Sequence, residues 1–573
     1  MSQQFREVTT WLREQVVGGH TRIQTPFGPR LIYYADLTAT GRHLAFVDEW
    51  VNRLSPYYAN THTAVSSTGN LLTELRATAR AIIAQAVNAS NQDEVVFVGS
   101  GATAAANKLV GLLGWRISEP LERVHRLGQA IPAAARPVVF VGPYEHHSNL
   151  LPWLESIAEV VEIGADSSGK ISLGELEARL AQYSARETKV GSFSAASNVT
   201  GVLSDVRAIA RVLHRNGALA FFDYAAAAPY VPIDMHPGTD DERVDALFLS
   251  PHKFLGGPGS SGVLVARREL FRSRVPERPG GGTVDYVAGA RRDAVDYVTG
   301  LAEREEGGTP AIAGDLRAGA SFLVKHAIGP QEILEHEMRL AEAAIARLAQ
   351  HRKIKVLGPR DLPRLAILSL SIDGLHHDLA SALLDHLFGI QNRAGCSCAG
   401  PYGHDLLGIR PEASARFRRL VRRGLNGMKP GWVRLSLPYY ANPEDIEFVL
   451  RAIEFVADHG IDFVPLYRLN WRDGVWRHID GVVPPSPGIE LSIEALEDAA
   501  DNPRGGVYER RLGETALREE RQRYFDEARD LAVRLGARFK VTRPRWNLPT
   551  GDAEIDELVW FRYVHAEGLS DVP

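Results

Sequence analysis

A lysine followed by a glycine-rich run occupies residues 250–262, with the sequence SPHKFLGGPGSSG. Lys253 comes directly after the apolar run ALFLS, which is typical of a buried strand. A lysine held in place with a lowered pKa forms imines with carbonyl compounds, and glycines let the backbone pack closely against a ligand. Taken alone, the pattern is equally compatible with a surface lysine that follows a strand.

A carboxylate ends a second apolar run, FFDYAAAAP at residues 221–229. Buried carboxylates are rare unless they are paired, and Asp223 alone is also compatible with a helix N-cap. A carboxylate in this position can keep the pyridine nitrogen of pyridoxal 5'-phosphate (PLP) protonated, which makes the ring an electron sink. Asp223 precedes Lys253 by one strand–crossover–strand unit, so we expect the two side chains to converge.

A third segment, residues 95–113, reads VVFVGSGATAAANKLVGLL and indicates a strand that runs through a glycine-rich turn into a helix. Free amides and the positive end of the helix dipole bind phosphate at such a helix N-terminus. The Thr103 hydroxyl can add a further donor, and Ala102 lies in the same first turn. Many α/β proteins contain this pattern, so it supports a phosphate site only in combination with the other two segments.

The elements that must position these residues form a predicted α/β domain. Five short apolar runs, each ending at small or polar residues, are typical of the buried strands of a mainly parallel sheet. In such sheets the reactive groups collect just beyond the carboxyl ends of the strands, where Asp223 and Lys253 fall. The predicted strands are Val95–Val98, Pro137–Val141, Val190–Phe193, Leu219–Asp223 and Ala246–Leu249.

The chain is too long for one compact core, so we expect several segments with different roles. They are an N-terminal arm at 1–29, a PLP-binding large domain at 30–315, a smaller α+β domain at 316–462 and a C-terminal extension at 463–573. The extension contains a predicted hairpin at Arg-Asp-Gly and a charged amphipathic helix. It shows no catalytic constellation, so a structural appendage or a dimer-contact module is the favoured interpretation.

Composition argues against several classes of function. The chain is 45% hydrophobic and 24% charged, and its formal net charge of -5 gives no footprint for nucleic acid or an anionic membrane. No apolar run is long enough to span a bilayer, and the N-terminus lacks the apolar stretch of a signal peptide. We therefore expect a cytoplasmic protein without nucleic-acid or membrane partners. Two cysteines alone cannot complete a zinc site, so no metal is expected.

In this order, the three segments resemble the class V aminotransferases, which are PLP enzymes of fold type I, and within them the cysteine desulfurase and selenocysteine lyase branch. The resemblance covers about residues 30–455 and implies PLP as cofactor, Lys253 as its Schiff-base lysine and a homodimer. It also implies cofactor contacts from the segments YEHHSNLLPW, SNVTG and SPHK. These are His146 on the pyridine ring, Asn198 at O3', and Ser250 and His252 at the phosphate.

Further segments resemble the parts of these enzymes nearest the substrate and the neighbouring subunit. NTHT points to His62 near the substrate, and EEGGTP points to Thr309, which reaches the partner's phosphate in the family's dimers. GWVRLSLPYY resembles the strand whose arginine grips the substrate α-carboxylate, here Arg434, because a guanidinium fork suits a carboxylate. One position departs from the desulfurase pattern: Ala226 stands where a glutamine usually follows the aspartate by three residues.

The loop NRAGCSCAG at residues 392–400 resembles the desulfurase loop whose cysteine takes sulfur from the substrate. Cys398 falls at that cysteine, and the R-x-G-C-x-C version looks most like that of the molybdenum cofactor sulfurases. A thiolate reacts best where nearby cations lower its pKa, and Arg393 and the imidazoles can do so. A pair of inert, small hydrophobic side chains is the alternative interpretation, and the role of Cys396 stays open.

Three functions remain open on these residues. The first is a cysteine desulfurase-like enzyme that converts L-cysteine to L-alanine, with a persulfide on Cys398 and a sulfur-acceptor protein as partner. The second is another PLP reaction, by a C–S or C–Se lyase, an aminotransferase or an epimerase, which Ala226 favours. The third is a non-catalytic sulfur carrier or scaffold. The basic helical run at residues 415–425 is interpreted as a solvated face, with an anionic partner as the alternative.

Overall fold

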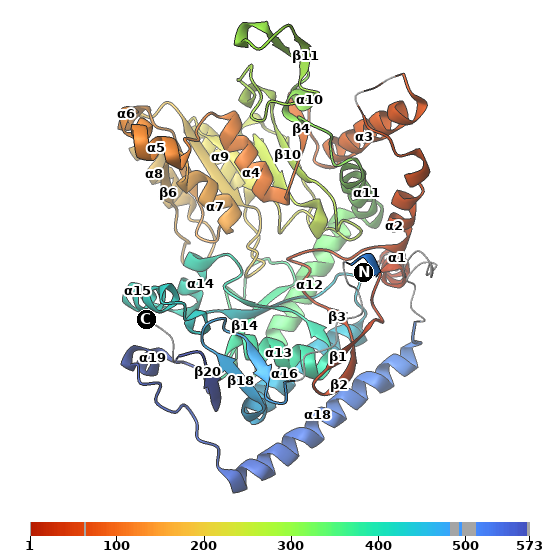
Figure 1. Cartoon of the computed structure of the whole chain (residues 1–573), viewed down its shortest axis with the longest axis vertical. Helices are drawn as coiled ribbons and strands as arrows, with labels where there is room; N and C mark the ends of the chain where they lie inside the picture. Colours follow the sequence, from red (N-terminus) through yellow and green to blue (C-terminus); the bar gives the residue numbers. More distant parts are fainter. Residues whose placement is uncertain (1, 62, 64, 482–491, 495–510, 570–573) are drawn as a thin grey trace. The chain divides into compact units, whose positions relative to one another are not determined.

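The computed structural model describes residues 2–61, 63, 65–481, 492–494 and 511–569 (Figure 1). The chain divides into two compact units. The first comprises Met1–Gln15, Thr38–Arg339 and Gly358–Leu365, and the second comprises Val16–Leu37, Leu340–Leu357 and Ala366–Pro573. Residues 316–339, expected in the small domain, belong to the first unit because α11 (Ile312–Ile328) packs along α3 (Ser67–Ala86). The other predicted segment boundaries stay predictions.

A seven-stranded sheet forms the centre of the first unit, in the order β4-β10-β9-β8-β7-β5-β6. The strands from β9 to β6 are parallel, and β10 runs antiparallel to both of its neighbours. This confirms the α/β fold class with a mainly parallel sheet. The strands are β4 (Asp93–Val98), β5 (Val138–Val141), β6 (Glu159–Glu162), β7 (Lys189–Ser194), β8 (Leu219–Asp223), β9 (Ala246–Leu249) and β10 (Gly262–Arg267).

Helices pack on both faces of this sheet. On one face, α4 (Gly101–Leu112) packs against β9 and β10, and α7 (His147–Leu154) packs against α4. Trp153 and Phe221 belong to the hydrophobic cluster on this face. Because side chains alternate along a strand, Phe222 points to the other face. There α9 (Val206–Arg215) packs against β8, and α8 (Leu173–Gln182) packs against α9.

Further elements of the first unit flank these layers. β11 (Val284–Val287) and β12 (Val295–Tyr297) form a separate two-stranded sheet. Additional helices are α1 (Gln3–Gln15), α2 (Ala45–Asn52), α5 (Glu119–His125), α6 (Leu127–Ala130) and α10 (Leu301–Glu305).

The second unit is built on a four-stranded antiparallel sheet in the order β13-β14-β17-β16. α13 (His377–Phe388) packs against β14 and β17, and α16 (Pro443–Phe463) packs against α13. The strands are β13 (Ile354–Val356), β14 (Ile367–Ile372), β16 (Arg393–Gly395) and β17 (Trp432–Ser436). Around them lie the hairpin of β1 (Arg22–Thr25) and β2 (Gly28–Leu31), the parallel pair β3 (Tyr33–Tyr34) and β15 (Ile390–Gln391), α14 (Gly400–Leu407) and α15 (Pro411–Arg422). The helix α12 (Pro330–Leu348) belongs to this unit from Leu340 onward.

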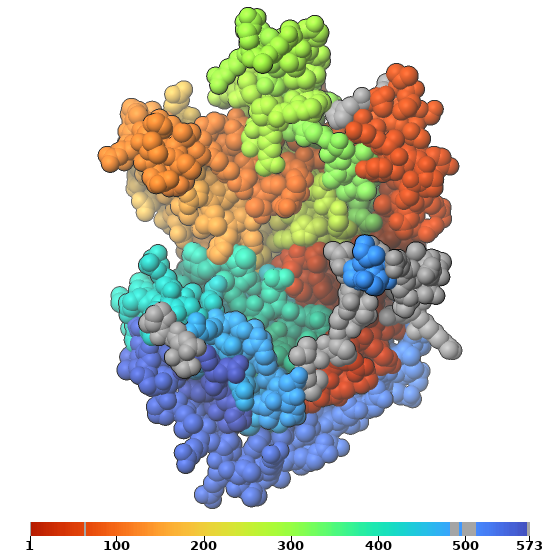
Figure 2. All heavy atoms as spheres, viewed as in Figure 1, coloured from red at the N-terminus to blue at the C-terminus, as the bar shows by residue number. Residues whose placement is uncertain are grey.

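The C-terminal extension folds as part of the second unit. The predicted hairpin forms as β18 (Tyr467–Asn470) and β19 (Trp476–His478), and β20 (His565–Glu567) pairs in parallel with β18. The charged helix is α18 (Glu514–Thr542), and the short helix α19 (Ala553–Leu558) lies beside α15 (Figures 1 and 2). Although α18 has 29 residues, no helix in the described part of the chain is apolar enough to cross a membrane.

Candidate active site

Lys253 lies in a tight turn between β9 and β10. The turn Pro251–Lys253 follows the end of β9, and the Lys253 amide donates to the Ser250 carbonyl at 3.0 Å. The carbonyl of His252 accepts hydrogen bonds from the Gly41 amide at 2.9 Å and the Thr40 hydroxyl at 3.1 Å. These contacts hold the backbone on either side of the lysine, so its position is fixed by the fold.

Asp223 ends β8, the strand next to β9 in the sheet. Its side chain is buried, and its Oδ1 accepts the Ala225 amide at 2.8 Å. Burial raises the pKa of Asp223, and the positive charge of Lys253 acts in the opposite direction. The predicted convergence is therefore present: the carboxyl ends of two adjacent parallel strands bring this carboxylate within electrostatic reach of the lysine.

The N-terminus of α4 meets the Lys253 turn. The buried amide of Ala102 donates to the Ser250 hydroxyl at 2.8 Å, and the Thr103 hydroxyl lies 2.6 Å from the Ser148 hydroxyl. Gly101 has a φ of +56°, and a Cβ there would lie 2.7 Å from Ser250 Oγ. Only glycine fits this left-handed position, which brings the helix amides close to Ser250.

Two of the three predicted histidines are His252, which lies in this turn, and His146, which precedes α7. Burial and the Lys253 charge lower the pKa of His252 to about 4, so its imidazole is neutral near pH 7. His146 caps α7, and its Nδ1 accepts the Ser148 amide at 3.1 Å. In the neutral ring the proton is therefore on Nε2.

Two other predicted cofactor residues lie in loops of the first unit. Asn198 is buried in the turn after β7, where the Ser197 hydroxyl accepts the amides of Val199 and Thr200 at 3.2 and 3.1 Å. Thr309 is exposed, and its hydroxyl accepts a hydrogen bond from the Asn60 amide group at 3.3 Å. His62 lies outside the described residues, so its predicted role stays a prediction.

The first unit also contains a buried carboxyl group that the sequence analysis missed. Glu145 precedes His146, and its Oε1 accepts the amides of Gly142 at 3.2 Å and Ser194 at 3.0 Å. Its Oε2 accepts from Asn149 Nδ2 at 2.6 Å and from the Ser194 hydroxyl at 2.7 Å. Burial raises the pKa of Glu145 to about 7, and the charge of Asp223 adds to this effect. The only signal in the sequence was its place beside His146.

These residues fit PLP. The buried carboxylate of Asp223 suits a protonated pyridine nitrogen, because a buried anion requires a cationic partner. The cradle of Gly101, Ala102 and Ser250 at the start of α4 suits a phosphate. Lys253 follows the neighbouring strand and suits the cofactor's aldehyde.

A second group of predicted residues lies in the second unit, around a carboxylate that was not predicted. Arg393 and Arg434 are paired across β16 and β17, and both contact Asp36. Nη2 of Arg434 lies 3.1 Å from Asp36 Oδ1, and Nε of Arg393 lies 3.0 Å from Asp36 Oδ2. Burial lowers the pKa of Arg434, whereas Asp36 and, more weakly, the nearby Cys398 act in the opposite direction. Cys398 therefore lies within electrostatic reach of Arg434.

The basic run at residues 415–425 has partners within the chain. Arg416 contacts Glu557 through both terminal nitrogens, at 2.9 and 2.7 Å. Arg423 contacts Asp552 at 2.7 Å, and both acidic residues belong to α19 or its N-cap. The basic face of α15 thus pairs with an acidic segment of the C-terminal extension, which neither interpretation of the sequence included.

A cluster of histidines in the second unit has the composition of a metal site. Within the described residues, His376, His377 and Asp378 bring three ligand atoms within 4.8 Å of one another. Both ring nitrogens of His376 already have partners, since Nδ1 accepts the Asp378 amide and Nε2 lies 3.1 Å from the Gly427 carbonyl. Trp560 stacks against both imidazoles. The arrangement is typical of a packed aromatic cluster, and the expected absence of a metal stays a prediction.

Comparison with known proteins matches this architecture to one family. Residues 33–449 match the family model described as "Aminotransferase class-V". A "Probable cysteine desulfurase" from Halalkalibacterium halodurans is 29% identical over 379 residues, which cover 65% of this chain and 85% of that protein. A protein of the same name from Pyrococcus abyssi is 29% identical over 446 residues, which cover 76% and 96%.

Solved structures give the same result. The apo structure of a cysteine desulfurase from Thermococcus onnurineus NA1 matches with a TM-score of 0.60 and 26% identity, over 74% of this chain and 95% of that one. A cysteine desulfurase structure from Escherichia coli matches with a TM-score of 0.57 over 74% and 94% of the two chains. At 22% identity, this second match supports the fold alone.

Proposed function

The chain belongs to the class V aminotransferase family of PLP-dependent enzymes, and from this premise we propose that it is a cysteine desulfurase. In this proposal it converts L-cysteine to L-alanine and holds the removed sulfur as a persulfide on Cys398. The observation that carries the proposal is the place of Cys398 on an exposed turn within electrostatic reach of Arg434. The Cys398 thiol suits nucleophilic attack on sulfur, and the Arg434 guanidinium suits the substrate carboxylate.

The first unit supplies the residues that we assign to the cofactor. Lys253 attaches it covalently, and Asp223 holds the proton on the pyridine nitrogen. When bound, PLP supplies the electron sink that stabilises the carbanion left at the substrate Cα. The remaining assignments are Ala102, Thr103, Ser250 and His252 at the phosphate, His146 on the ring face and Asn198 at O3'.

The chain's own residues then account for the individual tasks of desulfuration. Lys253 removes the proton from the substrate Cα, and Arg434, with Arg393 beside it, holds the α-carboxylate. The Cys398 thiolate attacks the substrate sulfur, so the carbon–sulfur bond breaks and a sulfur–sulfur bond forms on Cys398. We also assign His62 to the substrate side of the site.

A second candidate function rests on Ala226. This buried residue stands three positions after Asp223, where desulfurases usually carry a glutamine. A methyl group cannot donate a hydrogen bond, so proton transfer at the cofactor is tuned differently. This favours another PLP reaction, such as a C–S or C–Se lyase, an aminotransferase or an epimerase, in which Cys398 has no chemical role.

The proposal also includes an assembly and a location. Thr309 is exposed within the subunit, and as a phosphate ligand it serves the site of a second copy. We therefore propose that the protein is a homodimer. We also propose that it acts in the cytoplasm and passes sulfur to an acceptor protein. Sedimentation at working concentration measures the assembly, and a monomer that binds PLP fully removes the role of Thr309.

One experiment separates the two candidate functions. Purified enzyme is given L-cysteine and a dithiol reductant, and alanine and sulfide are measured together. Cys398→Ala is expected to keep PLP and its spectral response to amino acids, because the cofactor residues are untouched, but to release no alanine. Cys396→Ala is the matched control and keeps alanine formation. Full alanine release by Cys398→Ala contradicts the desulfurase proposal and favours the second candidate.

A further inference from the structure

The two cysteines occupy one tight turn. The Ala399 amide donates to the Cys396 carbonyl at 3.0 Å, which closes a four-residue turn. The two central residues, Ser397 and Cys398, have φ values of +49° and +56°. Positive φ at both central positions defines a type I′ turn, which normally holds glycine, asparagine or aspartate. Each L-residue in this left-handed region costs about 1–2 kcal/mol, so the loop maintains a strained conformation around the thiols.

This turn brings the Cα atoms of the two cysteines within the separation that disulfides span. With Ser397 in the left-handed helical region, mirror-image helix geometry places the Cα atoms of Cys396 and Cys398 about 5.4 Å apart. Disulfides span Cα separations of about 4.4–6.8 Å. An extended central residue would place the same atoms about 6.4–6.8 Å apart, at the upper limit of that range.

Both thiols are free and reachable. Cys398 is exposed and Cys396 is half-buried, and neither forms a disulfide. The sequence contains no third cysteine, so an intramolecular partner for Cys398 can only be Cys396.

We propose that Cys396 is a resolving thiol, which attacks the persulfide on Cys398 and releases the carried sulfur as hydrosulfide. This step rests on the proposed function, which supplies the persulfide. The Cys396 thiolate attacks Sγ of Cys398, the Cys396–Cys398 disulfide forms, and the bond from Sγ to the outer sulfur breaks. The outer sulfur takes the electron pair and leaves as hydrosulfide with the proton of the persulfide.

Electrons balance within the chain. The outer sulfur is reduced to sulfide, and the two cysteine sulfurs are oxidised to a disulfide, so this step requires no external oxidant. A dithiol reductant returns both cysteines to thiols for the next turnover. Transfer to an acceptor competes with the step, because an acceptor that removes the outer sulfur first leaves Cys396 reduced.

A single-turnover experiment tests the step. Reduced holoenzyme, freed of small thiols, receives one equivalent of L-cysteine per subunit, so that no excess thiol attacks the persulfide. Wild type is expected to release alanine and an equal amount of hydrosulfide, and its cysteine peptide loses two hydrogens, about 2 Da. Cys396→Ser is expected to release the same alanine but to retain the sulfur as a gain of about 32 Da, until a dithiol is added.

Two variants test the geometry while keeping both thiols. Proline fixes φ near −65° and cannot adopt the left-handed turn, so Ser397→Pro changes the directions in which the two cysteine side chains leave the backbone. It is expected to slow hydrosulfide release at least about tenfold, which corresponds to ~1.4 kcal/mol in the barrier. Ser397→Gly, the matched control, tolerates positive φ and is expected to release hydrosulfide at the wild-type rate.

A cofactor-independent arm separates this proposal from the proposed function. Lys253→Ala is treated with inorganic polysulfide, which loads Cys398 without amino-acid chemistry, and the peptide masses are followed with and without Cys396. The resolving role is supported if the added sulfur is lost and the disulfide forms only in the protein that contains Cys396. This holds even if L-cysteine gives no alanine. A persulfide equally stable with and without Cys396 in both arms overturns it, as does a persulfide located on Cys396.

Discussion

The cofactor region of the first unit and the C-terminal extension of the second unit differ in what determines their residue types. Around Lys253, residue types are set by chemistry: a lysine, a carboxylate and a glycine at fixed strand and helix ends. In the extension, residue types are set by packing, and many apolar residues satisfy the same contact. A catalytic site can therefore be recognised from a sequence motif. A structural segment that packs just as closely against the rest of the unit shows only hydrophobic periodicity in its sequence.

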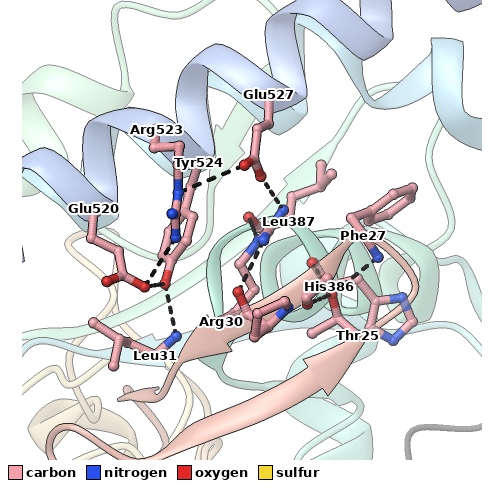
Figure 3. Close-up of polar contacts among 12 residues, drawn as sticks. Thr25, Phe27, Arg30, Leu31, His386, Leu387, Glu520, Arg523, Tyr524 and Glu527 are labelled. Atoms are coloured by element: carbon pink, nitrogen blue, oxygen red, sulfur yellow. Dashed lines mark hydrogen bonds and ion pairs between the residues drawn. The ribbon is translucent and has the colours of Figure 1, made fainter.

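The extension is built into the core of the second unit. Tyr524, Phe525 and Ala528 of α18 are buried in the same hydrophobic cluster as α13 and α16. Figure 3 shows the polar side of this contact: the Tyr524 hydroxyl accepts the Leu31 amide at 3.1 Å, and Arg30 contacts Glu527 at 2.9 Å. The N-terminal hairpin is thereby held between α13 and α18. The interpretation of a structural appendage agrees with these contacts.

The largest expected effect tests the cofactor region at its centre. Lys253→Ala removes the amine that forms the bond to PLP, so covalent attachment and turnover are expected to be lost completely. Borohydride reduction followed by peptide mass analysis measures the attachment. A pyridoxyl group found on any other lysine of the wild-type protein contradicts the assignment.

Asp223→Asn is expected to produce the next largest effect. The neutral amide no longer favours the pyridinium proton, and a hydrogen bond to a charged group is worth about 1.5–3 kcal/mol. Turnover should therefore fall by at least about tenfold to a hundredfold, while part of the PLP remains bound. Rate and cofactor content are measured on the same sample. Near-normal turnover would remove Asp223 from the proposed role.

Strand ends and short motifs were predictable because each depends on local residue types. All five predicted strands form, and the predicted charged helix of the C-terminal extension is present as α18. β6 was missed because its four residues are only partly buried and show no alternation. β10 was missed because GVLVAR follows a glycine-rich run that indicated a loop.

The missed charged residues share one physical reason. Asp36 pairs with Arg393 and Arg434 from distant strands, and Glu145 accepts hydrogen bonds from separate segments around β5 and β7. A carboxylate acquires such a role only when the fold assembles its donors. Likewise, the basic face of α15 had no visible partner because Glu557 lies more than a hundred residues away in the chain.

Tyr524→Ala tests whether the extension stabilises the second unit. Removing a buried aromatic ring costs about 3–5 kcal/mol, and the Leu31 amide also loses its acceptor. Tyr524→Phe is the matched control: it keeps the ring and is expected to cost only about 1–3 kcal/mol. Denaturant unfolding measures both free energies. If the Tyr524→Ala variant were as stable as the wild type, the extension would be peripheral to the second unit. The contrast drawn with the cofactor region would then be wrong.

Glu145→Gln tests a pH-dependent cost in the cofactor region. The pKa of Glu145 rises from its ordinary 4.5 to about 7 on folding, so the native state binds this proton more tightly than the unfolded state. The free energy of unfolding should therefore fall as pH rises from about 4.5 to about 7, by up to ~3 kcal/mol. Glutamine cannot ionise, so this part of the pH slope should vanish. An identical slope in both proteins contradicts the assignment.

The smallest expected effect concerns how the extension is fastened at α19. Asp552 caps α19 by accepting the amides of Glu554 and Ile555, and it also pairs with Arg423. Asp552→Ala loses both contacts and is expected to cost about 1 kcal/mol, most of it from the cap. Asp552→Asn keeps the cap and loses only the half-buried ion pair with Arg423, so it should change stability by less than about 1 kcal/mol. Denaturant midpoints at low and high salt measure both variants. If both variants lost the same stability at low salt and neither lost any at high salt, charge pairing with α15 would be what holds α19 in place.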